Sequence, residues 1–599
     1  MERTYGVTPP ISTTLPTEEE KRANEALAKE LRAQGTFEPP SETQKREDIL
    51  KHLQRIADEF VKRAAAEKHP KNPYLVRNAR GRIFTYGSYR LGVYGPGSDM
   101  DTLVVAPRYV DVEQYFKIFP DLLEELAPPG AITDLNPVPD AFVPIIKFEF
   151  NDISIDLIFC PIQSLGELPD EKDWNLHDNN LLRGLSENQV RSLNGTRVTD
   201  EILSLVPEPA TFRLAIRAIK LWAQRKAIYA NILGYPGGIA WNIMVARVCQ
   251  LYPKATSAVI VSKFFNIMLK WPWPLPVLLK DIEYGLTVTQ VAVWNPKIYH
   301  GDRNHRMPII TPSYPSMCTT HNVGASAMAV IKSELDKGAQ VTHEIMLGRR
   351  PWKDLFTKHS FFTTGFRFYL TVISSSKTRE AQNKWASFIE SRVRHLVMKL
   401  DMHSSIQLAR PFNKGYDRVH RCQTDAQIEE IQAGSLAYLV KAEDPEQPEV
   451  KAEVKAEIKT EIKGEAVKVE KTEDANGVKG EENGDVKIAD IPEHGTSTEH
   501  EIYTTNHYIG LQLKEGAKSL DLSREVNEFK TFCMSNDKIF DDKLMCLTVQ
   551  HVRNFDLPDD VFGPGEEKPR KPVKKKRPAT AEDSAKPDTK RQRTATAAG

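Results

Sequence analysis

Two aspartates, Asp99 and Asp101, are separated by a single residue directly after a glycine-rich stretch. If the chain is extended there, both carboxylates point to one side while Met100 turns into the core. Two crowded carboxylates repel each other unless a cation lies between them. A hard divalent ion with oxygen ligands is the expected partner, Mg²⁺ above all, with Mn²⁺ as a substitute. Upstream, Gly87 lets the backbone approach a phosphate closely, and Ser88 offers a hydroxyl to bond it.

A third carboxylate, Asp156, is placed by a predicted β-hairpin over residues 143–159. Two alternating apolar runs flank Asn151-Asp152, a dipeptide that suits a two-residue turn. In that register Lys147 lies across from Asp156. Because an unpaired carboxylate in an apolar strand is costly, Asp156 is either a structural ion-pair partner of Lys147 or a metal ligand. The other two aspartates favour the metal ligand, and we then expect Lys147 to contact an anionic group of the substrate.

The ordered set formed by Gly87-Ser88, Asp99-Met100-Asp101 and a later strand aspartate resembles the signature of the polymerase-beta-like nucleotidyltransferases. The fuller sequences TYGSYRLGVYGPGSDMDTL and YANILGYPGGIAWNIMVARVCQLYP closely resemble the eukaryotic nuclear poly(A) polymerases, fungal ones in particular. The resemblance covers roughly the first 440 residues and resumes after residue 500. It implies template-independent transfer of AMP from ATP to an RNA 3′-hydroxyl during pre-mRNA 3′-end processing, with release of pyrophosphate.

The resemblance also implies roles for particular residues. Asp99, Asp101 and Asp156 would bind two Mg²⁺ ions and carry the catalysis. Contacts with RNA or the nucleotide would involve Lys147, Asn194 and Asn231. The residues implied to bind ATP are Tyr86, Gly87, Ser88, Ser98, Lys220, Tyr229, Gly238 and Ile239. The partners implied are an RNA 3′ end, ATP and the cleavage and polyadenylation machinery, with a monomer as the catalytic unit.

Local patterns predict the elements that carry these residues. Thr17 and Ser41 fit capping boxes and should begin helices, and a further helix is expected near Val112–Leu126. Asn194 is expected at a helix end, where asparagine is ordinarily a cap. Residues 212–229 have the apolar spacing of a buried helix, on which Arg213, Arg217 and Lys220 would ordinarily form a solvated face. Residues 272–315 are dense in proline and are expected to form long loops.

Length and composition predict several domains, because the chain has 599 residues and single cores stop growing near ~250–300. The fold class is multidomain α+β. After residue 361, strand–helix–strand occurs twice, which favours a ferredoxin-like or RRM-like domain. The predicted units are an N-terminal helical segment (1–60), a nucleotidyltransferase domain (61–206), a mainly helical central domain (207–352), an RNA-binding RRM-like domain (353–563) and a basic disordered tail (564–599).

Charge is distributed unevenly although the net charge is zero. Residues 441–500 hold 9 lysines against 17 acidic residues and are predicted to form a disordered acidic insert, whose Lys-x-Glu repeats resemble attachment sites for a small ubiquitin-like modifier. Residues 574–577 are Lys-Lys-Lys-Arg, which predicts nuclear import. The six cysteines show no paired spacing, which argues against zinc or disulfides. Neither a signal segment nor a membrane span is expected.

Two alternatives stay open. Within the class, the chain could be a uridylyltransferase, a CCA-adding enzyme or an oligoadenylate synthase. Outside it, the chain could be a catalytically inactive RNA-binding scaffold. The presence of all three carboxylates argues against the scaffold.

Overall fold

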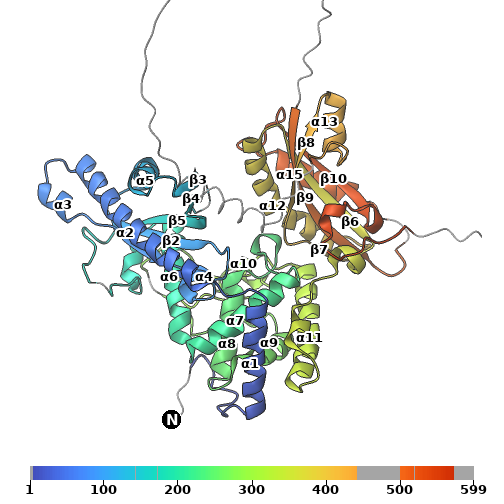
Figure 1. The fold of residues 1–599 in the computed structure, drawn as a ribbon, viewed down its shortest axis with the longest axis horizontal. Helices are drawn as coiled ribbons and strands as arrows, with labels where there is room; N and C mark the ends of the chain where they lie inside the picture. The colour runs from blue at the N-terminus through green and yellow to red at the C-terminus, as the bar shows by residue number, and fades with distance from the viewer. Residues whose placement is uncertain are drawn as a thin grey trace, which may run out of the picture.

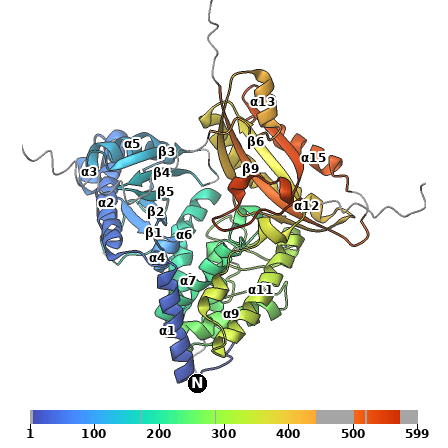
Figure 2. The same ribbon diagram turned by 45° about the vertical axis from the view of Figure 1, so that its right-hand side comes forward.

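The computed structural model describes residues 5–440 and 500–571, apart from positions 140, 142, 172, 286, 518 and 519. Two bodies that contain β-sheets stand side by side on a helical body (Figures 1 and 2). The first sheet, early in the chain, lies on one side, and the second, formed by the C-terminal part, lies on the other. The acidic insert, except His500, and the predicted import cluster at 574–577 lie outside the described residues.

The first body is built on a five-stranded sheet in the order β1-β2-β5-β4-β3. Strands β2 and β5 are parallel, and the other neighbours are antiparallel. Helices α2 and α5 cover one face of this sheet through a shared apolar core, and α6 packs on the other face. The bounds are β1 Arg82–Thr85, β2 Met100–Pro107, β3 Ile132–Val138, β4 Ile145–Phe150, β5 Ile153–Ile162, α2 Pro40–Lys68, α5 Val112–Leu126 and α6 Glu187–Leu205.

The hairpin predicted from alternation and turn chemistry is confirmed. Lys147 pairs with Asp156, and Phe150 with Ile153. Asn151 and Asp152 both have positive φ, 50° and 63°, as a tight hairpin turn requires of its two central residues. The predicted helix at Val112–Leu126 is also confirmed.

Of the two helix starts predicted from capping boxes, one is confirmed and the other is wrong. Thr17 caps α1 (Glu18–Ala33) with Glu20 in a complete capping box, as predicted. Helix α2 instead begins at Pro40, ahead of the predicted box at Ser41, and has no side-chain cap. Proline suits this first position because it needs no N–H partner there.

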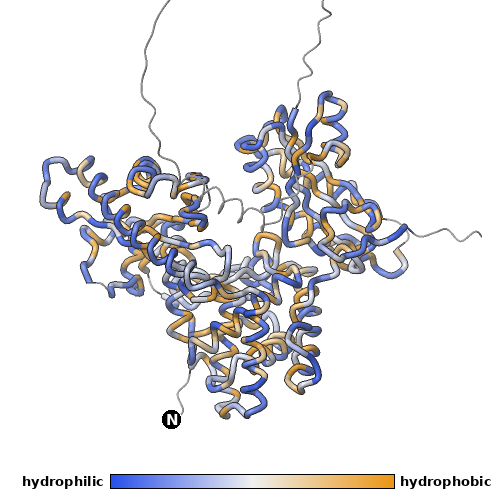
Figure 3. The backbone as a smooth tube through the Cα atoms, viewed as in Figure 1, coloured by the Kyte–Doolittle hydropathy of each residue, from blue (hydrophilic) through white to orange (hydrophobic). Residues whose placement is uncertain are grey.

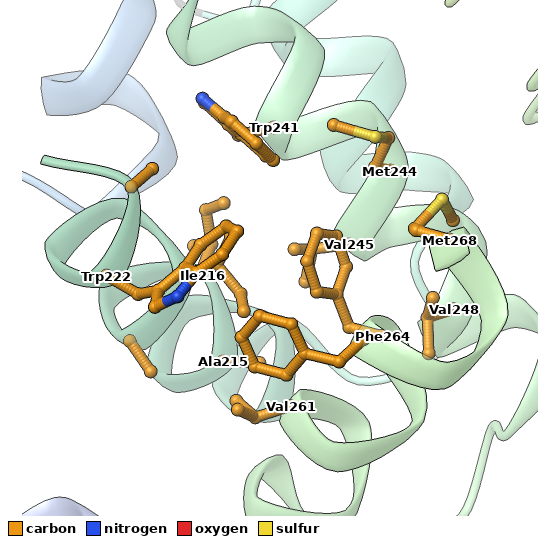
Figure 4. Close-up of a cluster of buried hydrophobic side chains, with 14 of the residues drawn as sticks. Ala215, Ile216, Trp222, Trp241, Met244, Val245, Val248, Val261, Phe264 and Met268 are labelled. Atoms are coloured by element: carbon orange, nitrogen blue, oxygen red, sulfur yellow. The ribbon is translucent and has the colours of Figure 1, made fainter. Parts of the chain in front are cut away.

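The helical body has a core of aromatic and aliphatic side chains from α7 (Pro209–Arg225), α8 (Gly238–Leu251) and α9 (Ser257–Lys270). Figure 4 shows Trp222, Trp241 and Phe264 meeting at its centre. Helix α11 (Ala325–Met346) packs on α9, as does the N-terminal helix α1, although α1 precedes the first sheet in the chain. In Figure 3 hydrophobic residues gather inside this body.

The C-terminal body has the predicted ferredoxin-like pattern. Four antiparallel strands lie in the order β10-β6-β9-β7, with α12 and α15 packed on them. Two elements were not predicted: β8 (Tyr416–Cys422), which pairs with β9, and α13 (Asp425–Gln432). The other bounds are β6 Phe368–Ser376, α12 Arg379–Asp401, β7 Ile406–Pro411, β9 His500–Leu513, α15 Ser523–Met534 and β10 Met545–Arg553.

Short elements complete the fold. The proline-dense segment 272–315 forms loops with one four-residue helix, α10 (His300–Arg303), so the prediction for it is largely confirmed. The other short helices are α3 (Pro73–Asn78) and α4 (Gly87–Leu91). All six cysteines are free thiols. Within the described ranges, no helix has both the length and the hydropathy to cross a bilayer.

Candidate active site

The three aspartates meet at one end of two adjacent parallel strands. Asp101 on β2 pairs in register with Asp156 on β5, and Asp99 lies just before β2 begins. One carboxylate oxygen from each residue lies within 4.8 Å of the other two. Met100 is fully buried, so the predicted alternation around it is present. The fold therefore brings Asp156, which is distant in sequence, next to the carboxylates of Asp99 and Asp101.

The glycine at the start of α4 is required by the aspartate beside it. Gly87 has φ of +63°, and a Cβ on it would overlap the Asp101 carboxylate. The Gly87 N–H donates to the Thr199 hydroxyl at 3.2 Å, and the Tyr86 N–H donates to the Asp101 carbonyl oxygen at 3.1 Å. The Gly87-Ser88 turn is thus seated directly against the carboxylates.

Electrostatics of the cluster favour a bound cation. Burial, and after it the charges of Asp99 and Asp156, raise the pKa of Asp101 to about 7, although Lys147 and Lys220 act in the opposite direction. Three carboxylates this close carry their full charge at little cost only when a cation neutralises them. Their oxygens form a donor set that suits a hard divalent metal ion.

Lys147 is the cation nearest to Asp156. Its Nζ donates to Asp156 Oδ1 at 2.8 Å and to Oδ2 at 2.7 Å, as the hairpin register predicts. The Lys147 side chain is 50% exposed and that of Asp156 is 22% exposed, so solvent screens the pair. The ammonium therefore contacts the same oxygens that a metal ion would use.

A cavity of about 910 Å³ lies over the carboxylates, between the first sheet and the helical body. It brings together most of the residues predicted for the site. Those that line it are Gly87, Ser88, Ser98, Asp99, Asp101, Lys147, Asp156, Lys220, Tyr229, Gly238 and Ile239.

The helical body contributes the far wall of this cavity. Burial lowers the pKa of Lys220, on α7, with Asp99 opposing the shift. Burial, together with Asp99 and Asp101, raises the pKa of Tyr229 to about 12. A Cβ on Gly238 would lie 2.5 Å from the Tyr229 hydroxyl, so only glycine lets α8 begin this close to the tyrosine. Lysine and tyrosine thus face the carboxylates across the cavity.

Three predicted site residues do not line the cavity. The Tyr86 ring packs against Gly195. Asn231 donates to the Thr319 carbonyl oxygen and accepts from Asn322. Asn194 lies inside α6, which corrects the prediction of a helix end. Helix α6 begins earlier, at a complete capping box on Ser186, and Asn194 is then buried with its side-chain oxygen accepting from Arg197.

Other lining residues were missed by the sequence reasoning, among them Gln224 and Asn242. Helical spacing could have found both. Gln224 lies four residues after Lys220 on α7, and Asn242 lies four residues after Gly238 on α8, so each shares a face with a predicted residue. The buried Asn242 side chain has no hydrogen bond with the described part of the chain.

The basic residues on α7 do not form the solvated face that such charges ordinarily make. Arg217 donates to three carbonyl oxygens, those of Thr36 (2.6 Å), Tyr94 (2.5 Å) and Gly92 (3.0 Å). Arg46 donates to the Ser98 carbonyl oxygen of the same loop at 2.7 Å. Two arginines therefore clamp the loop that leads into Asp99.

A carboxylate cluster on neighbouring strands, a Gly-Ser turn against it and a lysine across the cavity define the class of the nucleotidyltransferases. Family models agree over nearly the whole described chain. They match the poly(A) polymerase nucleotidyltransferase domain at residues 6–206, the poly(A) polymerase central domain at 211–358 and the poly(A) polymerase predicted RNA binding domain at 360–571.

Characterised relatives extend this agreement to the full length. The chain is 47% identical to Poly(A) polymerase pla1 of Schizosaccharomyces pombe over 99% of both chains. It is 42% identical to Poly(A) polymerase PAPa of Candida albicans over 97% of both. The chain belongs to the poly(A) polymerase family. A solved structure of Cid1, described with RNA terminal uridylyl transferase activity, is 14% identical to this chain, with a TM-score of 0.38. The match covers 57% of this chain and 99% of the Cid1 chain. A likeness this distant has no bearing on the substrate.

Proposed function

We propose that this chain catalyses template-independent polyadenylation, transferring AMP from ATP to an RNA 3′-hydroxyl and releasing pyrophosphate. The observation that carries the proposal is the set of three aspartates with oxygens within 4.8 Å of one another beside the Gly87-Ser88 turn. Membership of the poly(A) polymerase family supports adenylate as the group transferred and RNA as its acceptor.

The aspartates hold the metal ions in this proposal. Asp99, Asp101 and Asp156 would hold two Mg²⁺ ions, with Asp99 and Asp101 shared between the ions and Asp156 serving the ion that acts on the RNA hydroxyl. Two Mg²⁺ ions at these oxygens would acidify that hydroxyl and neutralise the leaving pyrophosphate. Mn²⁺ satisfies the same oxygen ligands and should substitute. Burial, and after it the charges of Asp99 and Asp156, raise the pKa of Asp101 to about 7, and a bound cation would offset both effects.

The remaining residues bind and orient the substrates. Gly87 and Ser88 face the cavity from the turn, and Lys220 and Tyr229 face it from the helical body, so the triphosphate is held between them. Gly238 and Ile239 form an open, apolar start to α8 against which the adenine ring packs. Asn194 and Asn231 reach RNA or the nucleotide only after a rearrangement, because both are engaged elsewhere in this structure.

Membership of the same family supports a proposal for the cellular role. We infer that the chain acts in the nucleus on pre-mRNA 3′ ends, with the cleavage and polyadenylation machinery as its partner. The basic residues at 574–577 support nuclear import. A chain ending at residue 571 keeps every described element and should extend a primer normally while failing to accumulate in nuclei. Normal nuclear accumulation of that shortened chain would place the import signal elsewhere.

Nucleotide choice is the direct test of the function. The full chain is incubated with a short RNA primer, Mg²⁺ and each nucleoside triphosphate in turn. ATP should support long extension, and UTP, CTP and GTP should support little. Preferred use of UTP, or addition that stops at CCA, would establish one of the alternative tailing activities. Binding of RNA without extension by any nucleotide would establish the scaffold.

A further inference from the structure

Asp99 is the one aspartate of the three that lies outside the strand pairing of the first sheet. The pairing of β2 with β5 begins at Met100, and the pairing of β2 with β1 covers Thr102–Val105. The Asp99 side chain is exposed, whereas those of Asp101 and Asp156 are partly buried. A metal ligand must be held within about 0.5 Å of its productive position. The backbone that leads into Asp99 therefore needs support from another part of the fold.

Arg46, on α2, gives this support. Its Nη2 donates to the Ser98 carbonyl oxygen at 2.7 Å, although the two residues are 52 positions apart in the sequence. That carbonyl belongs to the same peptide group as the Asp99 N–H, and a peptide group is planar. The hydrogen bond from Arg46 therefore fixes the plane from which the Asp99 backbone continues.

A turn in the loop holds Ser98 from its other side. The Ser98 N–H donates to the Gly95 carbonyl oxygen at 3.0 Å, and the Gly95 N–H donates to the Ser98 hydroxyl at 3.0 Å. Gly95 lies so close to the segment between α1 and α2 that a Cβ on it would be 2.9 Å from the Thr36 carbonyl oxygen. The turn is therefore packed directly on that segment.

Arg46 is itself fixed by a buried ion pair with Glu38. Its Nε donates to the two Glu38 oxygens at 3.0 and 3.1 Å, and its Nη2 donates to Oε1 at 2.9 Å. Only 2% of the Arg46 side chain and 3% of the Glu38 side chain are exposed. Because desolvation offsets most of the attraction in a buried ion pair, such a pair adds little to folding. Its place beside Asp99 favours a role in the site.

Glu38 belongs to the segment that joins the helical body to the first body. Helix α1 packs on α9 of the helical body, whereas α2 packs on the first sheet (Figure 1). Just before Glu38, the Thr36 carbonyl oxygen accepts from Arg217 of α7 at 2.6 Å, and the Phe37 ring lies 4.6 Å from the Arg217 guanidinium. The segment is therefore held by α7, the helix that carries Lys220.

We propose that Glu38 and Arg46 are positioning residues that set the orientation of Asp99 and thereby its affinity for a metal ion. Neither side chain lines the cavity, so both act through the Ser98 carbonyl oxygen. Partners that orient a metal ligand in this way are a general feature of metal sites. The inference rests on the proposed function, because it takes Asp99 to be a ligand of a divalent metal ion.

The test compares the unaltered full chain with Arg46→Met and with the double variant Glu38→Met, Arg46→Met. Mn²⁺ binding without nucleotide is measured by electron paramagnetic resonance of the free ion, and Tm by thermal unfolding. Arg46→Met should weaken Mn²⁺ binding about tenfold, the usual effect of removing a partner of a metal ligand. It should also lower Tm, because the Glu38 carboxylate stays buried without its partner. In the double variant Tm should recover while Mn²⁺ binding stays weak, because the Ser98 carbonyl oxygen still lacks its donor.

Arg418→Met is the matched control. Arg418 is also buried and forms a two-point ion pair with Asp560 at 2.7 and 2.9 Å, but it belongs to the C-terminal body. This variant should have a lower Tm and normal Mn²⁺ binding. Normal Mn²⁺ binding by the double variant would overturn the proposal and leave polyadenylation standing. An unaltered chain that neither binds Mn²⁺ nor extends a primer with ATP would contradict the proposed function itself.

Discussion

Replacing Lys147 by methionine should weaken catalysis while leaving the fold almost unchanged. The substitution keeps the length of the side chain and removes the ammonium that contacts both oxygens of Asp156 at 2.7 and 2.8 Å. Because this pair is partly exposed, it should contribute no more than about 1 kcal/mol to folding. A charge-assisted hydrogen bond to a substrate is worth roughly 1.5–3 kcal/mol, so kcat/KM should fall about ten- to a hundredfold.

The same substitution should weaken the use of substrate but not the binding of metal. The Lys147 ammonium occupies the oxygens that a metal ion needs, so the Mg²⁺ concentration for half-maximal rate should stay the same or fall in Lys147→Met. Steady-state kinetics with ATP, primer and Mg²⁺ varied in turn, together with thermal unfolding, measure all of these quantities. Lys117→Met is the matched control, because Lys117 forms a 2.7 Å ion pair with Glu67 away from the cavity. A lower Tm with unchanged kcat/KM for both substrates would show that Lys147 is only structural.

Three further predictions concern the backbone at Gly87, the arginine that holds the loop before Asp99, and the stability of the C-terminal body in acid. Gly87→Ala should lower kcat at least about tenfold, because the added Cβ overlaps the Asp101 carboxylate. The control Gly97→Ala, at φ +69° with open space around it, should keep normal kcat. Equal effects of the two substitutions in a primer-extension assay would refute this prediction. In Arg217→Lys one ammonium nitrogen replaces the two guanidinium nitrogens that reach the three carbonyl oxygens, so the variant should raise KM for ATP and lower Tm. An unchanged KM would limit the role of the arginine to folding. Burial lowers the pKa of His420 and His507 to about 4, so the unfolded chain binds protons at these residues before the folded chain does. Thermal unfolding of the full chain should therefore show the C-terminal body losing stability as pH falls from 6.5 to about 4. Unfolding that does not depend on pH over this range would contradict the prediction.

Local rules explain what could be predicted from the sequence. The hairpin register followed from period-two alternation and from two turn residues that tolerate positive φ, and it places Lys147 opposite Asp156. The side on which Asp99 and Asp101 lie followed from the same alternation. These are contacts between neighbours in sequence, where turn chemistry determines the geometry.

Long-range contacts account for what could not be predicted. Arg217 appeared to belong on a solvated face because nothing in its own helix shows that it reaches carbonyl oxygens of Thr36 and Gly92. Asn194 appeared to be a cap because the Ser186 box that starts α6 lies upstream of the segment considered. Strand β8 was missed because it carries a buried arginine, Arg418, whose ion-pair partner in the described part of the chain, Asp560, lies far along the sequence.

The central claim is that three aspartates act as one metal-binding unit. It is tested most directly by primer extension with ATP and Mg²⁺ as the only metal, comparing Asp99→Asn, Asp101→Asn, Asp156→Asn and the three double variants with the unaltered chain. Asparagine keeps the shape and removes the charge, so circular dichroism should show an intact fold. Each single variant should lose extension almost completely, and the doubles should be scarcely worse, because ligands that act as a unit are not additive. Near-normal extension by Asp156→Asn would contradict the account.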